Sequence, residues 1–313
     1  MTLGRRRFLH GLAAGAGSVV AGPLIRVARA SEPVVGTVTL LHTNDTHSRI
    51  DPFPEGSGRH ANRGGVARRT SLIRRVREVW PETLVLDGGD FFQGTPYFNR
   101  FKGEIEVKTL QAMGYDAVCI GNHDFDLGVE GLVAAMKHGR FPLLNANYEI
   151  QNPALRPLVK PYIVKQLGAV RVGVFGLGVA LDGLVNPKQC QGVSYRDPVA
   201  AARAAVEELR VDHGAHMVVA VSHLGFNGVL GEPGDQDWPR EVKGVDYVVG
   251  GHTHTFLDAP RGVRYGRGGW ETLVMQVGFA GINVGRADFD ISAGTPRLRY
   301  AGVVGVGGPA VLA

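Results

Sequence analysis

The segment "CIGNHDFDLG" at residues 119–128 places a group of polar side chains directly after an apolar run. The run "DAVCI" at residues 116–120 has the composition of a buried strand, and it stops at Gly121. Four polar residues then follow around one phenylalanine: Asn122, His123, Asp124 and Asp126. Ligand sites in α/β proteins lie in the loops beyond the carboxyl ends of strands. The segment therefore predicts a functional site at the edge of a sheet.

Four other predicted strands end in the same way. The stretches are "LLHTNDTH" with Asp45 and His47, "LVLDGGD" with Asp90, "VVAVSH" with His223, and "YVVGGHTH" with His252 and His254. A single histidine after a strand is usually a structural residue. Five such endings at one edge of a predicted sheet would converge in space, so together they indicate one shared site.

Strand and helix patterns alternate along most of the chain, which predicts an α/β fold with parallel strands early and antiparallel pairs later. The strands are short and almost wholly apolar, as in sheets covered on both faces. Strands are expected at residues 37–42, 83–89, 116–121, 141–148, 217–225 and 245–254, in a hairpin over 162–178 that turns near Gly168, and in runs between 273 and 306. Helices are expected at residues 64–80, 104–114, 129–139 and 197–214, the last with Asp197 as its N-cap.

The side chains at the strand ends have the chemistry of metal ligands. Two carboxylates, one amide and four imidazoles are too many for one tetrahedral zinc, but they suit two ions if one carboxylate bridges. Imidazole together with carboxylate favours Zn, Mn or Fe over Ca or Mg. Two divalent ions about 3.5–4 Å apart stabilise the attacking and leaving oxygens in a displacement at phosphorus. They also lower the pKa of a bridging water, so that a hydroxide nucleophile forms near neutral pH.

The residues of the opening segment divide between metal binding and catalysis. Asn122 offers a neutral carbonyl ligand, and His123 directly after it is expected to face the substrate. Asp126 is placed to hold one ring nitrogen of His123, which favours an imidazolium that can protonate the leaving oxygen. Asp124 is expected to cap the next helix, and capping of that helix is also the alternative role for Asp126.

A polar, Gly/Pro-rich loop at residues 225–239 follows His223. Either Asn227 or Trp238 from this loop could contact the substrate, alongside Asn122 and His123, or the loop could be ordinary surface.

The ordered set of motifs resembles the calcineurin-like metallophosphoesterases, and within them the bacterial 5′-nucleotidase group. The matching stretches are "LLHTNDTH", "GGVAR", "LDGGDFFQGTP", "GNHDFD", "LLNANY", "SHLG", "GGHTH" and "VMQVGFAGINVGRADF". The resemblance implies a four-layer αββα sandwich with two mixed β-sheets. It also implies that one metal takes Asp45, His47, Asp90 and His254, and that the other takes Asp90, Asn122, His223 and His252, with Asp90 bridging. His123 and Asp126 would be the catalytic dyad.

The resemblance covers one domain, expected at residues 31–313. Typical 5′-nucleotidases continue into a C-terminal domain that binds the nucleotide, and the sequence ends at Ala313, so that domain is expected to be absent. The implied function is hydrolysis of small phosphoesters: nucleoside 5′-monophosphates, nucleotide sugars or cyclic nucleotides. Two alternatives stay open, namely a thiosulfohydrolase of the sulfur-oxidation type on the same fold, and a metal-dependent binding protein without catalysis.

Residues 1–30 have the pattern of a twin-arginine signal peptide. Three arginines at positions 5–7 precede Phe8 and Leu9, a Gly/Ala-rich apolar stretch follows, and Ala28-Arg29-Ala30 forms a cleavage site. The apolar stretch is short and Gly-rich, which argues against a stable membrane anchor. The expected partner is the twin-arginine export machinery, and the expected location is the periplasm or the medium.

The basic character of the whole chain comes from this leader. The net charge is +5, from 34 basic and 29 acidic residues. Five arginines and no acidic residue lie in the first thirty positions, so the other 29 basic residues balance the 29 acidic ones. The charge therefore gives no reason to expect nucleic-acid or membrane binding. The sequence leaves open whether Cys119 and Cys190 pair, and it carries no signal of the oligomeric state.

Overall fold

The structure, a computed structural model, describes residues 35–267 and 269–307. The described residues all lie in the second of the two units into which the chain divides, Pro33–Ala313. The predicted leader at residues 1–30 lies outside the described residues. Within 35–267 and 269–307, no helix is both long enough and apolar enough to cross a membrane.

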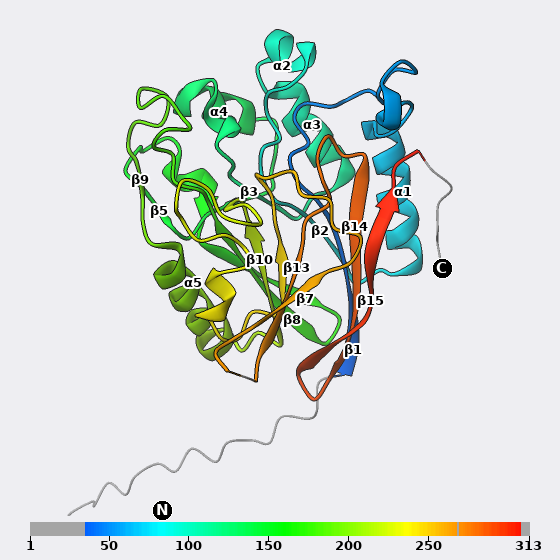
Figure 1. Cartoon of the computed structure of the whole chain (residues 1–313), viewed down its shortest axis with the longest axis vertical. Coiled ribbons are helices and arrows are strands. Elements are labelled where there is room, and N and C mark those ends of the chain that lie inside the picture. The colour runs from blue at the N-terminus through cyan, green and yellow to red at the C-terminus, as the bar shows by residue number, and fades with distance from the viewer. Residues whose placement is uncertain (1–34, 268, 308–313) are drawn as a thin grey trace, which may run out of the picture. The chain divides into compact units, whose positions relative to one another are not determined.

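Two mixed sheets form the centre of the second unit (Figure 1). In spatial order, the first sheet contains β15 (Thr295–Gly305), β14 (Asn283–Ser292), β1 (Val35–Thr43), β2 (Thr83–Asp87), β3 (Ala117–Cys119), β4 (Leu143–Leu144) and β6 (Val159–Lys160). The second contains β12 (Arg261–Arg264), β13 (Glu271–Met275), β11 (Tyr247–Val249), β10 (Met217–Ser222), β8 (Val170–Leu177) and β7 (Tyr162–Leu167). The inner strands run parallel, and antiparallel strands close the edges at β14–β15, β7 and β12.

Helices cover the outer faces of the sheets. Three of them, α1 (Val66–Val79), α3 (Glu104–Met113) and α4 (Gly128–Met136), pack on the first sheet, and α2 (Pro96–Phe101) contacts α3. On the other side, α5 (Pro198–Glu207) packs against β8. Figure 1 shows α1 and α5 on opposite sides of the strands. This arrangement confirms the predicted α/β sandwich with two mixed sheets.

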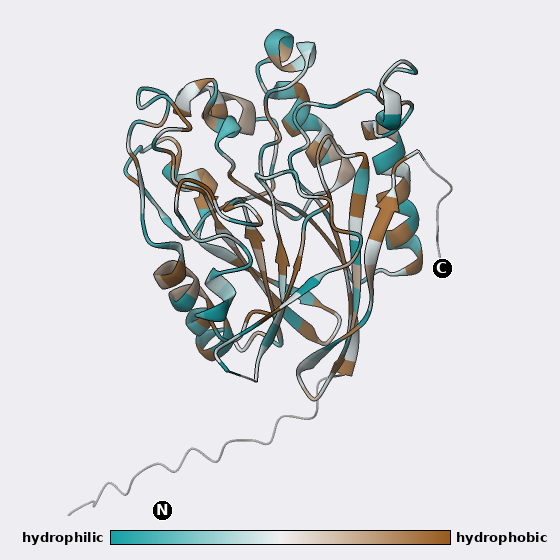
Figure 2. Ribbon diagram, viewed as in Figure 1, coloured by the Kyte–Doolittle hydropathy of each residue, from teal (hydrophilic) through white to brown (hydrophobic). Residues whose placement is uncertain are grey.

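Successive side chains of each strand point to opposite faces of the sheet, and both faces are buried, which explains why the strands are apolar on both faces. In β1, Leu40 lies in the core between the sheets, and Leu41 lies in the core under α1, α3 and α4. In β2, Leu84 and Leu86 face the first core and Val85 the second. Figure 2 shows the strands as mainly hydrophobic and the connecting loops as more polar. Loops at the strand ends are thus where polar side chains can gather.

The predicted strand at residues 141–148 is wrong as a single element. It divides into β4 and β5 (Tyr148–Ile150), and β5 pairs with β9 (Val193–Tyr195) in a separate ladder. The Asn145 side-chain oxygen accepts hydrogen bonds from the backbone N–H groups of Asn147 and Tyr148, at 3.0 and 2.7 Å. This local turn directs the chain out of the first sheet.

The other expected elements match more closely. The hairpin turns at Gly168, which has a φ of +53°. The Asp197 carboxylate accepts from the Val199 N–H at 2.9 Å, which confirms the N-cap of α5. A π turn at Glu208–Asp212 follows that helix. Cys119 and Cys190 are both free thiols, and Cys119 is buried.

A buried ion pair lies on β14. The Arg286 and Asp288 side chains are 3% and 5% exposed, with an Nη2–Oδ2 distance of 2.8 Å. The Thr39 hydroxyl donates to Asp288 Oδ1 at 2.8 Å. The Arg286 guanidinium also lies over the Trp80 ring, 3.8 Å from its centroid. This pair joins β14 to β1 through Thr39 and to the end of α1 through Trp80.

We expect Asp288→Ala to lower the free energy of unfolding by about 3–5 kcal/mol, because it leaves the Arg286 charge buried without its partner. The measurement is urea denaturation. Glu271→Ala breaks the exposed pair between Arg264 and Glu271, whose side chains are 73% and 48% exposed, and should cost less than about 1 kcal/mol. A loss in Asp288→Ala no larger than in this control would contradict the prediction.

Candidate active site

The polar side chains predicted to converge do lie at one edge of the sandwich. Asp45, Asp90 and Asn122 follow β1, β2 and β3 of the first sheet. His223 follows β10 and the pair His252 and His254 follows β11, both in the second sheet. The carboxyl ends of these five parallel strands therefore bring residues from both sheets together. Two groups of three side chains result, and the ligand atoms in each group lie within 4.8 Å of one another.

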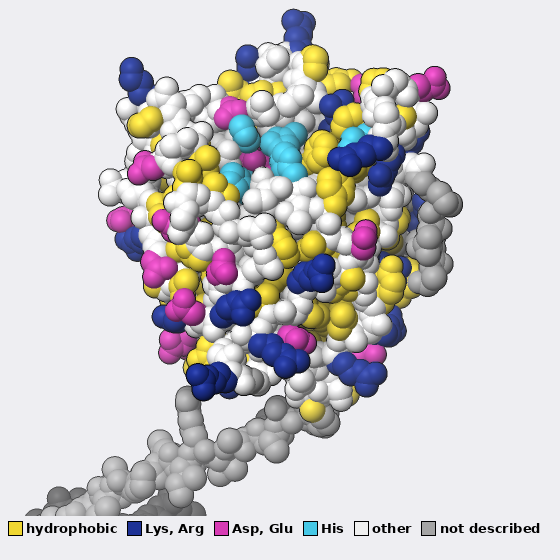
Figure 3. Space-filling model, viewed as in Figure 1, with side chains coloured by type: hydrophobic (Ala, Val, Ile, Leu, Met, Phe, Trp, Pro, Cys, Tyr) yellow, Lys and Arg dark blue, Asp and Glu magenta, His cyan; other side chains and the backbone are white. Residues whose placement is uncertain are grey.

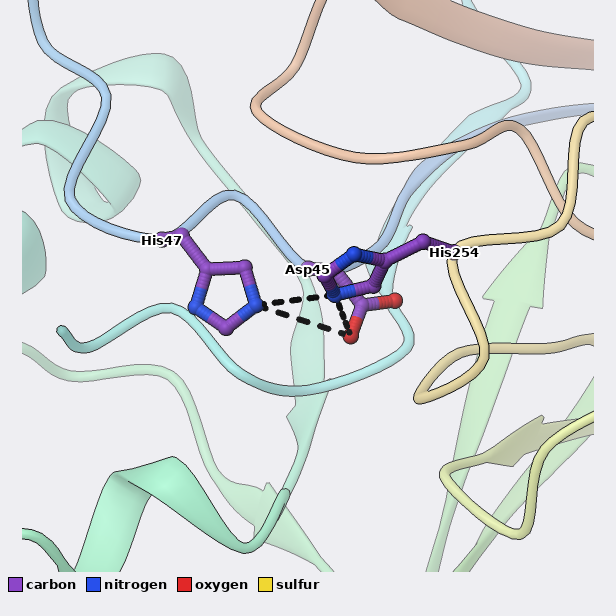
Figure 4. Close-up of side chains that lie close together, drawn as sticks. All are labelled: Asp45, His47 and His254. Atoms are coloured by element: carbon purple, nitrogen blue, oxygen red, sulfur yellow. Dashed lines mark hydrogen bonds and ion pairs between the residues drawn. The ribbon is translucent and has the colours of Figure 1, made fainter. Parts of the chain in front are cut away.

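The first group contains Asp45, His47 and His254 (Figure 4). The two Nε2 atoms of His47 and His254 are 3.0 Å apart, and Asp45 Oδ1 lies 3.3 Å from His254 Nε2 and 4.0 Å from His47 Nε2. Two nitrogen ligands on one zinc-sized cation stand about 3–3.4 Å apart, given metal–nitrogen bonds of about 2.0–2.1 Å. The spacing of the two imidazoles therefore fits a shared cation.

The second group contains Asp90, His223 and His252. Asp90 Oδ2 lies 3.1 Å from His223 Nε2 and 3.9 Å from His47 Nε2, so this carboxylate faces both groups. Asn122 Oδ1 is buried and has no hydrogen-bond partner among the described residues. Buried polar atoms normally have a partner. A carbonyl oxygen in this position fits a bound cation, so the donor set as a whole is suited to two divalent ions.

Backbone carbonyls set the orientation of two imidazoles. His47 Nδ1 donates to the Phe92 carbonyl at 3.1 Å, and His223 Nδ1 donates to the Gly88 carbonyl at 2.7 Å. Each bond leaves Nε2 turned toward the carboxylates, as in histidines that bind metals.

Protonation of the histidines responds to burial and to Asp90. Burial lowers the pKa of His47 and lowers that of His252 to about 4, so both are neutral near pH 7. Burial also acts to lower the pKa of His223, but the charge of Asp90 and its hydrogen bond outweigh this and raise it to about 10. Metal ligation needs neutral imidazole, so binding of a cation at His223 would release a proton.

The backbone is left-handed at five of the six residues in the two groups. The φ angles are +50° at Asp45, +44° at His47, +57° at Asp90, +74° at His252 and +50° at His254. Positive φ is uncommon outside glycine, and each such residue costs of order 1–3 kcal/mol unless its surroundings hold it. The contacts around these loops must therefore supply the stabilisation.

Asp124 is one source of that stabilisation, and its predicted role as a helix cap is wrong. Its buried carboxylate accepts from four backbone N–H groups: those of Gly121 at 2.7 Å, Phe91 at 3.1 Å, and Asp90 and Phe92 at 3.2 Å. Burial raises the pKa of Asp124 well above its usual value, and these donors oppose the rise. The contacts tie the loop after β3 to the loop that carries Asp90.

Asn44 and Gln276 hold the remaining loops, and neither was expected to contribute to the site. Asn44 Nδ2 donates to Asp45 Oδ2 and to the Gly278 carbonyl, both at 2.6 Å. Gln276 Nε2 donates to the Gly251 carbonyl, and its Oε1 accepts from the Thr255 N–H. Asn44 lies directly before the D-x-H motif, and Gln276 lies in "VMQVG". Neither stretch contains a local pattern that would predict these long-range hydrogen bonds.

Gly121 explains the bend in the opening segment. A Cβ atom at this position would lie 2.1 Å from Asp90 Oδ1 and 2.5 Å from the Asp90 backbone nitrogen. Only glycine allows the chain after β3 to pass this close to Asp90. The apolar strand therefore has to end at a glycine before the polar residues begin.

His123 and Asp126 lie together at the rim of the two groups. His123 Nδ1 is 3.1 Å from Asp126 Oδ2, and the side chains are 38% and 32% exposed. The hydrogen bond with Asp126 is the main cause that raises the pKa of His123. The His123 ring lies 5.4 Å from that of His47, measured between centroids, and its backbone N–H donates to Asp90 Oδ1 at 2.8 Å.

The structure contradicts a substrate contact by Trp238. Its side chain is fully buried, its ring packs on Phe175 with centroids 6.2 Å apart, and Nε1 donates to Asp235 Oδ1 at 3.1 Å. The tryptophan instead anchors the loop to the core. Asn227 is exposed and accepts from Gln236, and its contact with substrate stays a prediction.

Comparison with known proteins identifies the family. Residues 38–256 match the model described as calcineurin-like phosphoesterase. The chain belongs to this family. It is 38% identical over 234 residues to a snake venom 5′-nucleotidase from Crotalus adamanteus, covering 70% of this chain and 37% of that protein. The chain thus spans well under half the length of this relative.

Solved structures agree with this placement. A 5′-nucleotidase precursor from Thermus thermophilus superposes with a TM-score of 0.78 at 34% identity, over 88% of this chain and 56% of that one. A sulfate thiohydrolase from the same species has a TM-score of 0.71 at 23% identity, over 86% and 56% of the two chains. At that identity the second likeness shows a shared fold only.

We expect Asp124→Asn to weaken Mn²⁺ binding by about 10–100-fold, because the new amide would turn N–H groups toward backbone donors and release the Asp90 loop. The measurement is calorimetric titration of the metal-free protein. The control is Asp246→Asn, a buried carboxylate before β11 that accepts from the Val218 N–H at 2.7 Å. The control should lose stability but keep its Mn²⁺ affinity. An unchanged affinity in Asp124→Asn would show that the loop does not depend on this residue.

Proposed function

We propose that this chain hydrolyses phosphoesters of small molecules at a dinuclear metal centre, as an enzyme of the 5′-nucleotidase type. The observation that carries the proposal is the position of Asp90, whose Oδ2 faces His223 at 3.1 Å in one candidate metal group and His47 at 3.9 Å in the other. A carboxylate between two such groups is suited to bridge two cations.

The proposed ligand sets follow from the two groups. One cation would be held by Asp45, His47, Asp90 and His254, and the other by Asp90, Asn122, His223 and His252. Imidazole, carboxylate and amide donors suit Zn, Mn or Fe. Two carboxylates do not neutralise two divalent cations, so the loaded centre would carry a net positive charge and attract an anionic phosphoryl group.

The catalytic chemistry divides between the metals and the dyad. The chemistry that two bound divalent cations would supply is a lowered pKa for a water molecule and neutralisation of charge on the phosphoryl oxygens. Asp126 holds Nδ1 of His123, which leaves Nε2 free to face the substrate. His123 then donates a proton to the leaving oxygen as the ester bond breaks, and Asp126 stabilises the imidazolium beforehand. With the addition of water, a phosphomonoester gives an alcohol and inorganic phosphate, and a phosphodiester gives an alcohol and a phosphomonoester. A nucleotide sugar would give a nucleoside monophosphate and a sugar phosphate, and the proton then goes to the leaving phosphate oxygen.

The substrates we propose are nucleoside 5′-monophosphates, nucleotide sugars or cyclic nucleotides. Support comes from the 5′-nucleotidase relatives, one of which is 38% identical over 234 residues, and from the family model, whose match at residues 38–256 includes the candidate site. The dyad disfavours a binding protein without catalysis, because capture of an anion needs no proton donor. Thiosulfate-ester hydrolysis has the support of a shared fold alone.

We further propose that residues 1–30 direct export by the twin-arginine route, on the basis of the sequence pattern. Replacing Arg5 and Arg6 by lysine should retain the unprocessed chain in the cytoplasm, because the export machinery reads the arginine pair. Cell fractionation and amino-terminal sequencing are the measurements, with Ser31 expected as the first residue of the exported wild type. Arg29→Lys is the control and should be exported normally. Normal export of the double variant would overturn this proposal.

We expect His123→Ala to slow hydrolysis of 5′-AMP far more than hydrolysis of an aryl phosphate. General acid catalysis contributes about 10²–10⁴-fold when the leaving group is an alkoxide, whereas an aryl oxide leaves with little help from a proton. The measurement is kcat for 5′-AMP and for the aryl phosphate, with Mn²⁺ or Zn²⁺. The same assay is run on a wider panel of an aryl phosphodiester, a nucleotide sugar and a thiosulfate ester, which tests the proposed reaction.

Two controls accompany that comparison. His138→Ala changes another surface histidine of similar exposure, 37% against 38% for His123, and should leave both rates unchanged. Asp90→Ala, and removal of metal by a chelator, should abolish turnover of every substrate. Robust turnover by Asp90→Ala would overturn the proposed mechanism, and equal losses for both esters in His123→Ala would remove His123 as the proton donor.

A further inference from the structure

A cluster of aromatic side chains lies directly beside the first candidate metal group. The aromatic cluster consists of Phe53, His60, Phe256 and Phe279. The ring of His254 stacks on Phe279, with centroids 5.2 Å apart and planes 17° from parallel. Figure 3 shows hydrophobic side chains next to the histidines on this face, with a further histidine and basic side chains beyond them. The cluster thus begins one ring away from a proposed metal ligand.

Two rings of the cluster, His60 and Phe256, are nearly parallel, and a third, Phe279, lies beside both. His60 and Phe256 are within 16° of parallel, and their centroids are 6.4 Å apart. Phe279 is almost perpendicular to both, at 82° in each case, with centroids at 5.6 Å from His60 and 5.9 Å from Phe256. A separation of 6.4 Å is near the long end of the range of about 4.5–7 Å for aromatic pairs in direct contact. The direct contact between the His60 and Phe256 rings is therefore weak, and their faces could still stack on a ligand.

The backbone fixes the position of Phe256. An antiparallel bridge pairs Phe256 with Val277, and the phenyl ring lies across Gly278. A Cβ at Gly278 would lie 2.2 Å from the ring, and this glycine has a φ of +88°. The ring is held in place without any ligand, which lowers the entropic cost of binding one.

The cluster is open to solvent and is flanked by cations. Phe256 is 42% exposed, and the other three rings are half-buried. The guanidinium carbon of Arg49 lies 4.1 Å from the Phe53 centroid, and Arg59 Nε donates to His60 Nε2 at 3.1 Å. Burial, and then the charges of Arg59 and Arg63, lower the pKa of His60. His60 is therefore an uncharged ring at neutral pH, suited to stacking on another ring.

We propose that the aromatic cluster binds the planar base in the leaving group of a phosphoester. Phe256 and His60 would stack on this base while the phosphoryl group lies at the candidate metal centre. This inference rests on the proposed hydrolytic function. In a nucleoside 5′-phosphate, one sugar ring separates the base from the phosphate. In the protein, one ring, that of Phe279, separates His254 from the rings of His60 and Phe256. The spacing of the cluster from the candidate metal group therefore resembles that of the base from the phosphate. The chain itself would then favour nucleobase-containing phosphoesters over sugar phosphates.

The test compares 5′-AMP with ribose 5-phosphate, which shares the phosphoryl group and the primary alcohol but lacks the base. We expect Phe256→Ala to lower the ratio of kcat/KM for 5′-AMP to that for ribose 5-phosphate by about 10-fold, mostly through KM, because stacking on a base is lost. Phe256→Leu keeps an apolar side chain and should fall in between. Phe101→Ala is the matched control, since Phe101 on α2 is also 42% exposed and lies outside the cluster.

A second measurement does not depend on turnover. Adenosine should bind weakly to the full chain in the presence of a chelator, as measured by chemical-shift changes in NMR titrations, and Phe256→Ala should weaken this binding by a similar factor. An unchanged substrate ratio, or adenosine binding unaffected by the substitution, would overturn the inference. So would a change in oligomeric state in Phe256→Ala, measured by light scattering, because the cluster would then be a contact between chains.

The outcomes separate this inference from the function on which it rests. If the wild type hydrolyses both esters with equal kcat/KM, the aromatic cluster has no role in selection, but phosphoester hydrolysis stands. If no ester in the panel is hydrolysed by the metal-loaded chain, the proposed function itself is wrong.

Discussion

Two buried carboxylates at one edge of the sandwich impose the main physical constraint on this protein. Asp45 and Asp90 are almost wholly buried, and their oxygens lie 4.0 and 3.1 Å from the same atom, His223 Nε2. Burying two like charges this close together is costly unless positive charge compensates them. The surrounding imidazoles and the Asn122 amide can ligate cations at this place. The local chemistry is therefore suited to hold bound positive charge.

The rest of the site supports that arrangement through hydrogen bonds to the backbone. Asp124 gathers four amide groups, Asn44 spans from Asp45 to the Gly278 carbonyl, and Gln276 holds the loop that carries His252 and His254. These contacts fix residues whose left-handed backbone is unfavourable on its own. The strain and its support occur together, as is common where geometry matters for function.

The sequence allowed prediction of the fold class and of the convergence of the strand-end residues, because strands that end in polar groups are a local pattern and parallel strands share an edge. It could not assign Asp124, whose partners at Asp90, Phe91 and Phe92 lie more than thirty positions away. Trp238 was misjudged because its burial depends on packing against Phe175 on a strand distant in sequence. The aromatic cluster was missed for the same reason, since its members come from three segments that share no motif.

Each candidate metal group draws its side chains from both sheets. Asp45 and His47 follow β1 of the first sheet while His254 follows β11 of the second, and Asp90 from the first sheet meets His223 and His252 from the second. A cation bound by either group would cross-link the two sheets of the sandwich. The loaded protein would then resist proteases and heat as one cooperative body, and its melting temperature would rise with the concentration of free metal.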